Sequence, residues 1–326
     1  MKAQRGVALI TVLLVVAIVT VVSAGMIARQ QPSIHTTANQ LQARQAWHYA
    51  LGGEALAQSI LRRDLRATLE SGAAQAPVDH LFEPWALPQP AFDIEQGRIQ
   101  VRIEDLAGRF NLNSLVQNQQ ANAAALAQFQ RLLLRLDIGE PYAERLVDWL
   151  DSDQQPSGER GAEDNAYLLL EPPYRTAGRG LIDLSELRLL LDMRDEHFQR
   201  LAPYVTTLPA DVPLNVNTAS AVVLSTLGDR LSQSAAEAMV QARRGEGFRE
   251  VATFLAQPAM SGIDLKGTSL AVSSQYFQAV SDVRLGDRRL ALVSLLQRQD
   301  DGEVRVLQRN LGQPPRLLRP SEEGDR

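Results

Sequence analysis

The chain opens with the short basic leader MKAQRG (residues 1–6), which runs directly into VALITVLLVVAIVTVVSAGMIA (residues 7–28). The second part contains no charged residue and no proline. As an α-helix rising about 1.5 Å per residue, it would be about 33 Å long, which is enough to cross the hydrocarbon core of a bilayer. The sequence therefore predicts a transmembrane helix over residues 7–28, with the rest of the chain attached to a membrane or exported through one.

Three fates of this segment fit its residues. Val22-Ser23-Ala24 has the small residues of a secretory cleavage site, although the apolar run is long for a signal peptide. The second fate is an uncleaved anchor with Lys2 and Arg5 on the cytoplasmic side. The third is cleavage directly after Gly6, because a six-residue basic leader that ends in Gly resembles the leader of type IV pilin-like precursors.

The composition describes a folded, acidic body. With 45% apolar residues among 326, the chain can bury a large core and is expected to form more than one domain. It has no cysteine, which excludes disulfides and thiolate metal sites. Three of the 33 basic residues and none of the 38 acidic residues lie in residues 1–31, so residues 32–326 carry a formal charge of −8. This charge disfavours tight binding to nucleic-acid phosphates.

A long helix is expected to follow the membrane segment. Apolar residues recur at helical spacing from about residue 35 to residue 70. We predict that this stretch continues the membrane helix as a spine, with a kink or interruption at Pro32; two unrelated helices are the alternative. Residues 71–91 carry four prolines and are expected to form a loop.

Strand patterns lie on both sides of a helical region. Apolar and polar residues alternate over residues 97–104, and further strands are expected at Tyr276–Leu285, Arg288–Arg298 and Glu303–Leu307, separated by turns. The residues between 105 and 275 have mostly helical patterns. The predicted fold class is therefore α+β: a long N-terminal helix and a small antiparallel sheet, interrupted by a large helical insertion. The tail after Asn310 is expected to be disordered.

The insertion contains a weak internal repeat. FNLNSL (residues 110–115) and LNVNTA (residues 214–219) share an Asn-x-Asn pattern, and a helical segment follows each. Because Asn, Ser and Thr cap helices, each motif is expected to start a helix, which predicts two related helical subdomains at residues 105–210 and 211–275.

The second subdomain suggests an alternative function. Both subdomains are expected to have a SAM-like or helix-hairpin-helix-like fold. The second resembles the helix-hairpin-helix modules that grip DNA backbones, which use a Gly-x-Gly hairpin to bind phosphate. The corresponding stretch, GDRLS (residues 228–232), lacks the second Gly and contains an acid. A membrane-anchored DNA-binding protein of the competence type therefore stays as the alternative, and nucleic-acid binding is not expected.

The densest polar segment covers residues 148–165. Six carboxylates fall within residues 148–164, with Arg160 as the basic residue among them. Oxygen ligands with Gly and Pro turns suit calcium, although the spacing does not match an EF-hand. We predict a loop-wrapped calcium site; a solvated acidic loop is the alternative. The expected ligands are Asp151, Asp153, Glu163 and Asp164, with assistance from Asp148.

The sequence does not support an enzyme. The four histidines are scattered without metal-ligand spacing, and the chain contains no phosphate-binding Gly-rich loop and no nucleophile elbow.

Together these features resemble the type II secretion minor pseudopilin K family, also called the general secretion pathway protein K family. The resemblance covers nearly the whole chain. The segments that carry it are the leader ending at Gly6, GRFNLN (residues 108–113), DWLDSD (residues 148–153), GAED (residues 161–164) and NVNTA (residues 215–219).

The resemblance implies a pilin-like fold and a structural role. A prepilin peptidase would cleave between Gly6 and Val7, and Val7 would be a methylation site. The protein would be single-pass in the inner membrane with its globular part in the periplasm. It would join minor pseudopilins I and J at the pseudopilus tip, next to other pseudopilins and the inner-membrane assembly platform. Calcium is associated with the fold.

The same resemblance divides the chain into seven parts. They are a leader (1–6), a transmembrane segment (7–28), a spine with the first strands (29–104), two helical subdomains (105–210 and 211–275), the last strands (276–310) and a flexible tail (311–326).

Thr11 is a departure from most pilin-like subunits. They carry Glu at the fifth mature position, where it is thought to pair with the N-terminal amine of a neighbouring subunit. A carboxylate within the bilayer is costly without such a partner. Loss of the acid at Thr11, together with a bulky insertion, therefore suits a topmost subunit.

Overall fold

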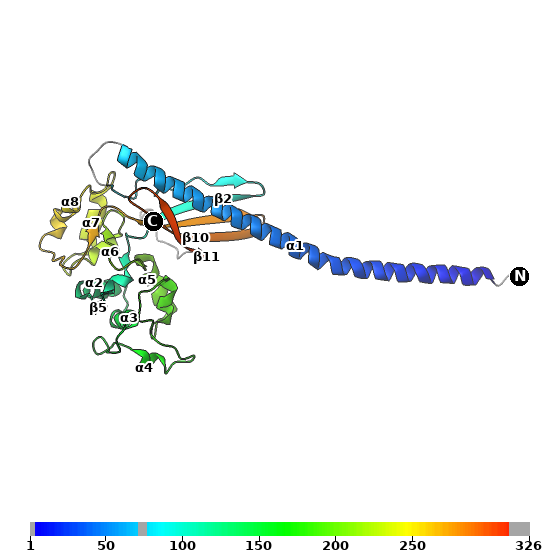
Figure 1. Cartoon of the computed structure of the whole chain (residues 1–326), viewed down its shortest axis with the longest axis horizontal. Helices are drawn as coiled ribbons and strands as arrows, with labels where there is room; N and C mark the ends of the chain where they lie inside the picture. The colour runs from blue at the N-terminus through cyan, green and yellow to red at the C-terminus, as the bar shows by residue number, and fades with distance from the viewer. Residues whose placement is uncertain (1–3, 71–76, 313–326) are drawn as a thin grey trace.

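The computed structural model describes residues 4–70 and 77–312, and its first element is a single very long helix. Helix α1 (Gln4–Glu70) has 67 residues, and its N-terminal half projects alone from the rest of the molecule (Figure 1). The prediction of one continuous helix is confirmed. At Pro32 a kink or an interruption was predicted; the interruption is wrong, because the chain stays helical through this residue, and the kink stays a prediction. An internal proline removes one backbone hydrogen bond but leaves those on either side of it in place.

The C-terminal half of α1 lies on a five-stranded antiparallel sheet with the order β1-β2-β9-β10-β11. The strands are β1 (Phe92–Ile94), β2 (Gly97–Asp105), β9 (Tyr276–Leu285), β10 (Arg288–Arg298) and β11 (Val304–Leu311). The predicted strands 276–285 and 288–298 are confirmed. Strand β11 extends to Leu311, beyond the predicted end of the sheet. The sequence did not reveal β1, which has only three residues.

Close packing joins α1 to the sheet. Ala50, Ala57 and Leu61 of the helix are fully buried, together with Val101 of β2 and Phe277 of β9. Small residues on this face of the helix let it approach the strands. The connecting loop adds Trp85, which is buried with its ring edge-on to Phe277 (centroids 5.2 Å apart).

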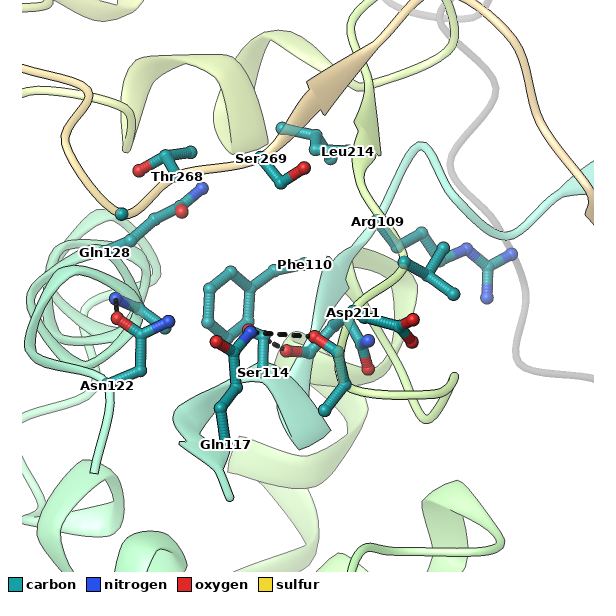
Figure 2. Close-up of a pocket in the computed structure, with 15 residues that line it drawn as sticks. Arg109, Phe110, Ser114, Gln117, Asn122, Gln128, Asp211, Leu214, Thr268 and Ser269 are labelled. Atoms are coloured by element: carbon teal, nitrogen blue, oxygen red, sulfur yellow. Dashed lines mark hydrogen bonds between the residues drawn. The ribbon is translucent and has the colours of Figure 1, made fainter. Parts of the chain in front are cut away.

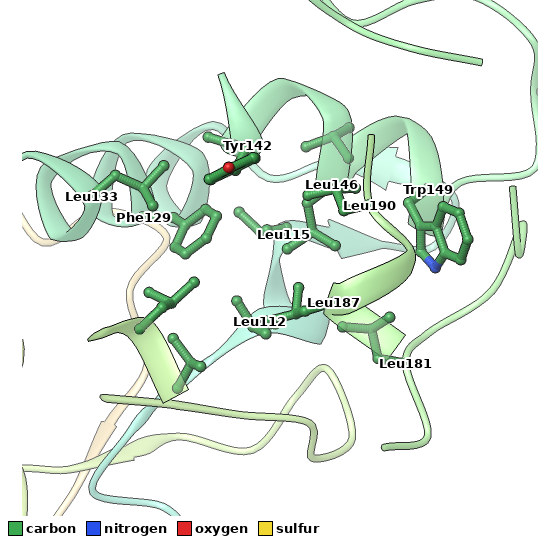
Figure 3. Close-up of a cluster of buried hydrophobic side chains, with 14 of the residues drawn as sticks. Leu112, Leu115, Phe129, Leu133, Tyr142, Leu146, Trp149, Leu181, Leu187 and Leu190 are labelled. Atoms are coloured by element: carbon green, nitrogen blue, oxygen red, sulfur yellow. The ribbon is translucent and has the colours of Figure 1, made fainter. Parts of the chain in front are cut away.

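The chain leaves the sheet after β2 and returns to it at β9, so residues 106–275 form an insertion at the end of the sheet far from the N-terminus (Figure 1). The first part has its own core around Phe129, Tyr142 and Leu146 (Figure 3). Its elements are β3 (Phe110–Asn111), η1 (Leu112–Leu115), β4 (Val116–Gln117), β5 (Gln120–Ala121), α2 (Ala123–Arg135), α3 (Tyr142–Leu150), α4 (Asp164–Tyr167), η2 (Leu184–Leu189), α5 (Asp195–Leu201), η3 (Ala202–Tyr204) and β6 (Val205–Thr206).

The second part of the insertion has a separate core around Val223, Leu224 and Phe254. Its elements are β7 (Leu214–Asn215), α6 (Ala221–Ser225), α7 (Gln233–Ala242), α8 (Val251–Leu255), η4 (Pro258–Met260) and β8 (Leu270–Ala271).

The two Asn-x-Asn motifs occupy equivalent positions in these two parts. Each begins in a two-residue strand that pairs in parallel with the strand ending its part, β3 with β6 and β7 with β8. The side-chain oxygens of Asn111 and Asn215 accept hydrogen bonds from the backbone N–H two residues later.

The second asparagine of each motif bonds a distant loop. Asn113 pairs with the backbone N–H and C=O of Leu181, and Asn217 does the same with Phe248. Only the first motif caps the helix that follows it: Asn111 caps η1, whereas Ser220 caps α6. A helix does follow the second motif, because α6 begins at Ala221, but its cap is Ser220 and not an asparagine of the motif.

Candidate metal centre and membrane helix

The acidic segment wraps between α3 and α4, in the part of the insertion farthest from the sheet (Figure 1). Asp151 is the C-cap of α3, and Glu163 is the N-cap of α4. Trp149 and Tyr167 pack edge to face beneath the loop, with ring centroids 5.2 Å apart. Both ends of the loop are therefore anchored in the apolar core.

Three of the predicted ligands come together. Asp151, Asp153 and Glu163 each place one carboxylate oxygen within 4.8 Å of the other two. Asp151 and Glu163 are buried, and Asp153 is exposed. This places two carboxylates from the loop ends and one from the loop itself around one point.

The structure gives Asp148 and Asp164 other roles. Both oxygens of the fully buried Asp148 accept backbone hydrogen bonds, from Ser157 (2.7 Å) and Ala162 (2.6 Å). Asp164 accepts from the backbone and hydroxyl of Thr176 and pairs with Arg175 at 2.7 Å. These two carboxylates shape the loop and are not part of the three-carboxylate group.

Two further residues of this loop were not expected from the sequence. A side chain at Gly161 would collide with the Asp148 carboxylate and the Ser157 backbone, so the tight turn around Asp148 requires Gly there. Glu144 lies one turn before Asp148 and faces Gly158, with one buried oxygen that has no hydrogen-bond partner. The four-residue spacing between Glu144 and Asp148 puts both side chains on one face of a helix, and this spacing could have indicated the role of Glu144.

The electrostatics of the three-carboxylate group fit a cation. Burial, with the charges of Asp153 and Asp148, raises the pKa of Asp151 to about 6. Burial and the surrounding acids raise the pKa of Glu163 to about 7. One oxygen of Asp151 and both oxygens of Glu163 are buried without a hydrogen-bond partner. Unsatisfied buried carboxylate oxygens are costly, and a hard divalent cation such as calcium would satisfy them.

The membrane-facing part of α1 is apolar and exposed. Ala8–Met26 is long and apolar enough to span a bilayer, and none of this window is buried in the molecule. Gly6 and Val7 belong to the first turns of α1. The Thr11 hydroxyl donates to the carbonyl of Ala8 at 2.9 Å. The side chain at this position is therefore satisfied within its own helix, where a carboxylate would not be.

The turn that would bind DNA in the alternative function is attached to the first part of the insertion, with Asp229 exposed. A side chain at Gly228 would collide with Ile263, and Asp229 pairs with Arg131 of α2 at 2.8 Å. Arg131 also donates to the Thr226 carbonyl at 2.6 Å, and Arg135 donates to the Leu231 carbonyl at 2.9 Å. The hairpin is thus engaged with the first part of the insertion, which disfavours phosphate binding there.

A cavity of about 70 Å³ lies between the two parts of the insertion (Figure 2). Its polar groups bond mostly to the protein: the Ser114 hydroxyl donates to the Asn111 carbonyl, and Gln117 donates to the Ala210 carbonyl. Small-molecule sites are typically several times larger, so this cavity is a gap at the junction.

Comparisons with known proteins agree with this architecture. The family model "Type II secretion system (T2SS), protein K" matches residues 108–210 and 214–273. The type II secretion system protein K of Pseudomonas aeruginosa is 51% identical, covering 99% of this chain and 97% of the relative. The protein of the same name from Klebsiella pneumoniae is 38% identical, covering 91% of this chain and 93% of the relative.

A solved structure is similar over most of the chain. It is described as the crystal structure of the GspK-GspI-GspJ complex from the type 2 secretion system of enterotoxigenic Escherichia coli. The matched chain is 32% identical with a TM-score of 0.75, covering 85% of this chain and 99% of that one. The chain therefore belongs to the type II secretion system protein K family.

Proposed function

We propose that this protein is a structural minor pseudopilin, without enzymatic activity, that assembles with minor pseudopilins I and J at the tip of a periplasmic pseudopilus. The observation that carries this proposal is the division of α1: its segment Ala8–Met26 is exposed and apolar, and its C-terminal half is packed on a sheet. Such a helix attaches a folded head to a membrane and leaves an outer face free for neighbouring subunits. The similarity to a chain of the GspK-GspI-GspJ complex supports the choice of partners.

Reconstitution tests the assembly. We expect the full chain to co-purify as a stable ternary complex with I and J from membranes that hold all three. A gel shift with duplex DNA separates this role from the competence-type alternative. Tight, salt-sensitive DNA binding without a ternary complex would refute the pseudopilin assignment.

The outer face of α1 is the proposed interaction surface, within residues 40–65. Gly52, Ala55 and Ser59 are exposed along the face opposite the buried Ala50 and Ala57. Small side chains on one face let a second helix come close. Ala55→Trp should abolish ternary assembly, whereas Ala252→Trp, at an exposed helical alanine of α8, should leave it intact.

Processing after Gly6 follows from this role. We propose inner-membrane insertion with the head in the periplasm, cleavage by prepilin peptidase between Gly6 and Val7, and methylation of Val7. The N-terminal residue of the mature protein tests this directly. Val7 supports the pilin route, Gly25 would indicate an ordinary signal peptide, and Met1 would indicate an uncleaved anchor.

We propose that Thr11 and the insertion favour a position at the tip. Because Thr11 is satisfied by its own helix, it needs no partner amine from a subunit above it. The Thr11→Glu variant should be incorporated below other subunits, or inserted less stably, and cross-linking of assembled pseudopili would report its position. Unchanged exclusive placement at the tip would show that Thr11 does not determine the order.

We also propose that Asp151, Asp153 and Glu163 hold a calcium ion, with Asp148 and Asp164 fixing the loop around it. Calcium would then stabilise the insertion by mass action, by about 2.7 kcal/mol at a hundredfold excess over Kd. Chelation should lower the melting temperature of the wild type, and Asp153→Asn should remove this response. Glu159→Gln changes an exposed acid of the same loop and should keep it. An unchanged melting temperature after chelation would refute the site.

A further inference from the structure

A second group of buried charged side chains lies where the insertion joins the sheet. Asp64 of α1 and Asp79 and Glu83 of the connecting loop place carboxylate oxygens within 4.8 Å of one another. The Arg298 guanidinium, at the end of β10, is 2.6 Å from both oxygens of Asp79 and 3.2 Å from Oδ2 of Asp64. Arg298 is 4% exposed and Asp79 is 1% exposed. One cation therefore faces three carboxyl groups with little water.

Hydrogen bonds connect this group to both chain crossings of the insertion. The Ser274 backbone donates to Asp79 Oδ2 at 2.7 Å, and the Ser274 hydroxyl donates to Asp105 Oδ2 at 2.6 Å. The Asn215 amide nitrogen lies 3.1 Å from the Asp79 carbonyl and 3.0 Å from Asp105 Oδ2. Asp105 ends β2 and Ser274 precedes β9, so the network joins the spine, the sheet and the insertion. We use the name joint for the seven residues of this network, which are Asp64, Asp79, Glu83, Asp105, Asn215, Ser274 and Arg298.

The joint contains an excess of acid. It holds four carboxyl groups, on Asp64, Asp79, Glu83 and Asp105, and one guanidinium, on Arg298. Glu83 already accepts from the His80 backbone and the Trp85 indole through one oxygen. Two buried and two half-buried carboxylates near a single cation repel one another, and the least costly response is for the group to keep a proton.

Next to the joint, the charged side chains that the structure describes are paired elsewhere or favour a neutral form. Arg109 lies beyond Asp105 and is already paired with Glu104 at 3.0 Å. On the other side, burial lowers the pKa of His80, which favours its neutral form. Arg249 near His80 is exposed and paired with Glu246 at 2.7 Å.

We propose that the joint is a proton-dependent lock: it holds the insertion on the spine and sheet while it retains a proton, and it loosens when that proton is lost as the pH rises to neutrality.

The direction in which the pKa values of three carboxyl groups in the joint are shifted supports this lock. Burial is the largest cause that raises the pKa of Asp64 to about 6, of Glu83 to about 7 and of Asp105 to about 6. Groups whose pKa is raised in the folded state stabilise it fully below their unfolded values, and this stabilisation is lost as the pH rises through the folded values. The lock should therefore weaken as the pH rises from about 4, near the unfolded values, to about 7, the highest folded value.

Amide hydrogen exchange of the full chain in detergent micelles tests the lock. Exchange at about pH 6 and about pH 8.5, corrected for the intrinsic rate, should show protection at residues 77–87, 105–109 and 272–277 falling on the order of tenfold at the higher pH. Peptides from the core of the first part, residues 125–134, serve as the internal reference.

Two variants complete the test. Asp64→Asn with Glu83→Gln removes two of the three carboxyl groups whose pKa is raised, so protection at the joint should keep only the smaller pH response of Asp105. Glu54→Gln changes a buried carboxylate of the same helix that is paired with Arg309, and it should keep the wild-type pH response. The proposal is overturned if wild-type protection at the joint does not change with pH, whatever the variants do. It is also overturned if a folded double variant keeps the full response.

Discussion

Substitution of Gly53 tests how α1 is held on the sheet. A Cβ at this position would collide with the Ser281 hydroxyl and lie 2.9 Å from Ser281 Cβ and 3.1 Å from Val101 Cγ2. Val101 and Ser281 are buried in the middle of the sheet and have little room to move. Overpacking of this kind costs about 1–3 kcal/mol, whereas replacing Gly by Ala within a helix gains about 1 kcal/mol.

The neighbouring Gly52 provides the matched control. A Cβ there meets nothing within 4 Å, so Gly52→Ala should gain about 1 kcal/mol from helix propensity alone. The two alanine variants therefore differ by the packing cost, about 1–3 kcal/mol, with Gly53→Ala the less stable.

Urea unfolding followed by tryptophan fluorescence measures this difference. Trp85 is buried in the core between α1 and the sheet, and Trp149→Phe removes the signal of the insertion. Because the Ser281 hydroxyl is buried without a hydrogen-bond partner, Ser281→Ala should recover part of the loss in the Gly53→Ala background. If Gly53→Ala proves as stable as Gly52→Ala, the helix is not held against the strands as described.

Three further predictions concern buried polar groups. Asn113→Ala removes hydrogen bonds to Leu181 and Leu208 and should cost about 2–3 kcal/mol in urea unfolding, whereas Ser114→Ala, next to it, should cost less than about 1 kcal/mol. Asp148→Asn should speed proteolytic cleavage within residues 151–163, because one of two backbone N–H groups loses its acceptor; equal rates would contradict this role. The Arg309 and Ser294 hydrogen bonds outweigh burial and lower the pKa of Glu54, so its contribution is present above about pH 4.5 and is lost as the pH falls through the folded value. In the Glu54→Gln variant, the free energy of unfolding should fall less steeply as the pH is lowered. An unchanged slope would show that Glu54 does not cause this pH dependence.

The helical spacing of apolar residues and the alternation of apolar and polar residues predicted much of the fold. The uncharged run after Gly6 and the helical spacing to residue 70 predicted α1, since both are local patterns. The alternation in residues 276–298 predicted β9 and β10 with their bounds. Strand β1 was missed because three residues are too few for a period-2 signal, and it forms only by pairing with β2.

The acidic loop was only partly predictable. Clustering of like charges in residues 148–164 indicated that these carboxylates need solvent or a cation. It did not distinguish Asp151, Asp153 and Glu163, which converge, from Asp148 and Asp164, which bond to the backbone, Thr176 and Arg175. That distinction depends on how α3 and α4 bring the two loop ends together.

The sequence by itself determined the membrane helix, the α+β class and the position of the insertion, because hydrophobic runs and periodic patterns are properties of neighbouring residues. The tertiary structure alone decided which carboxylates share a site and how the insertion is joined to the sheet. Asp64, Asp79, Asp105 and Arg298 are far apart in the chain, and their burial together depends on contacts that no local pattern contains.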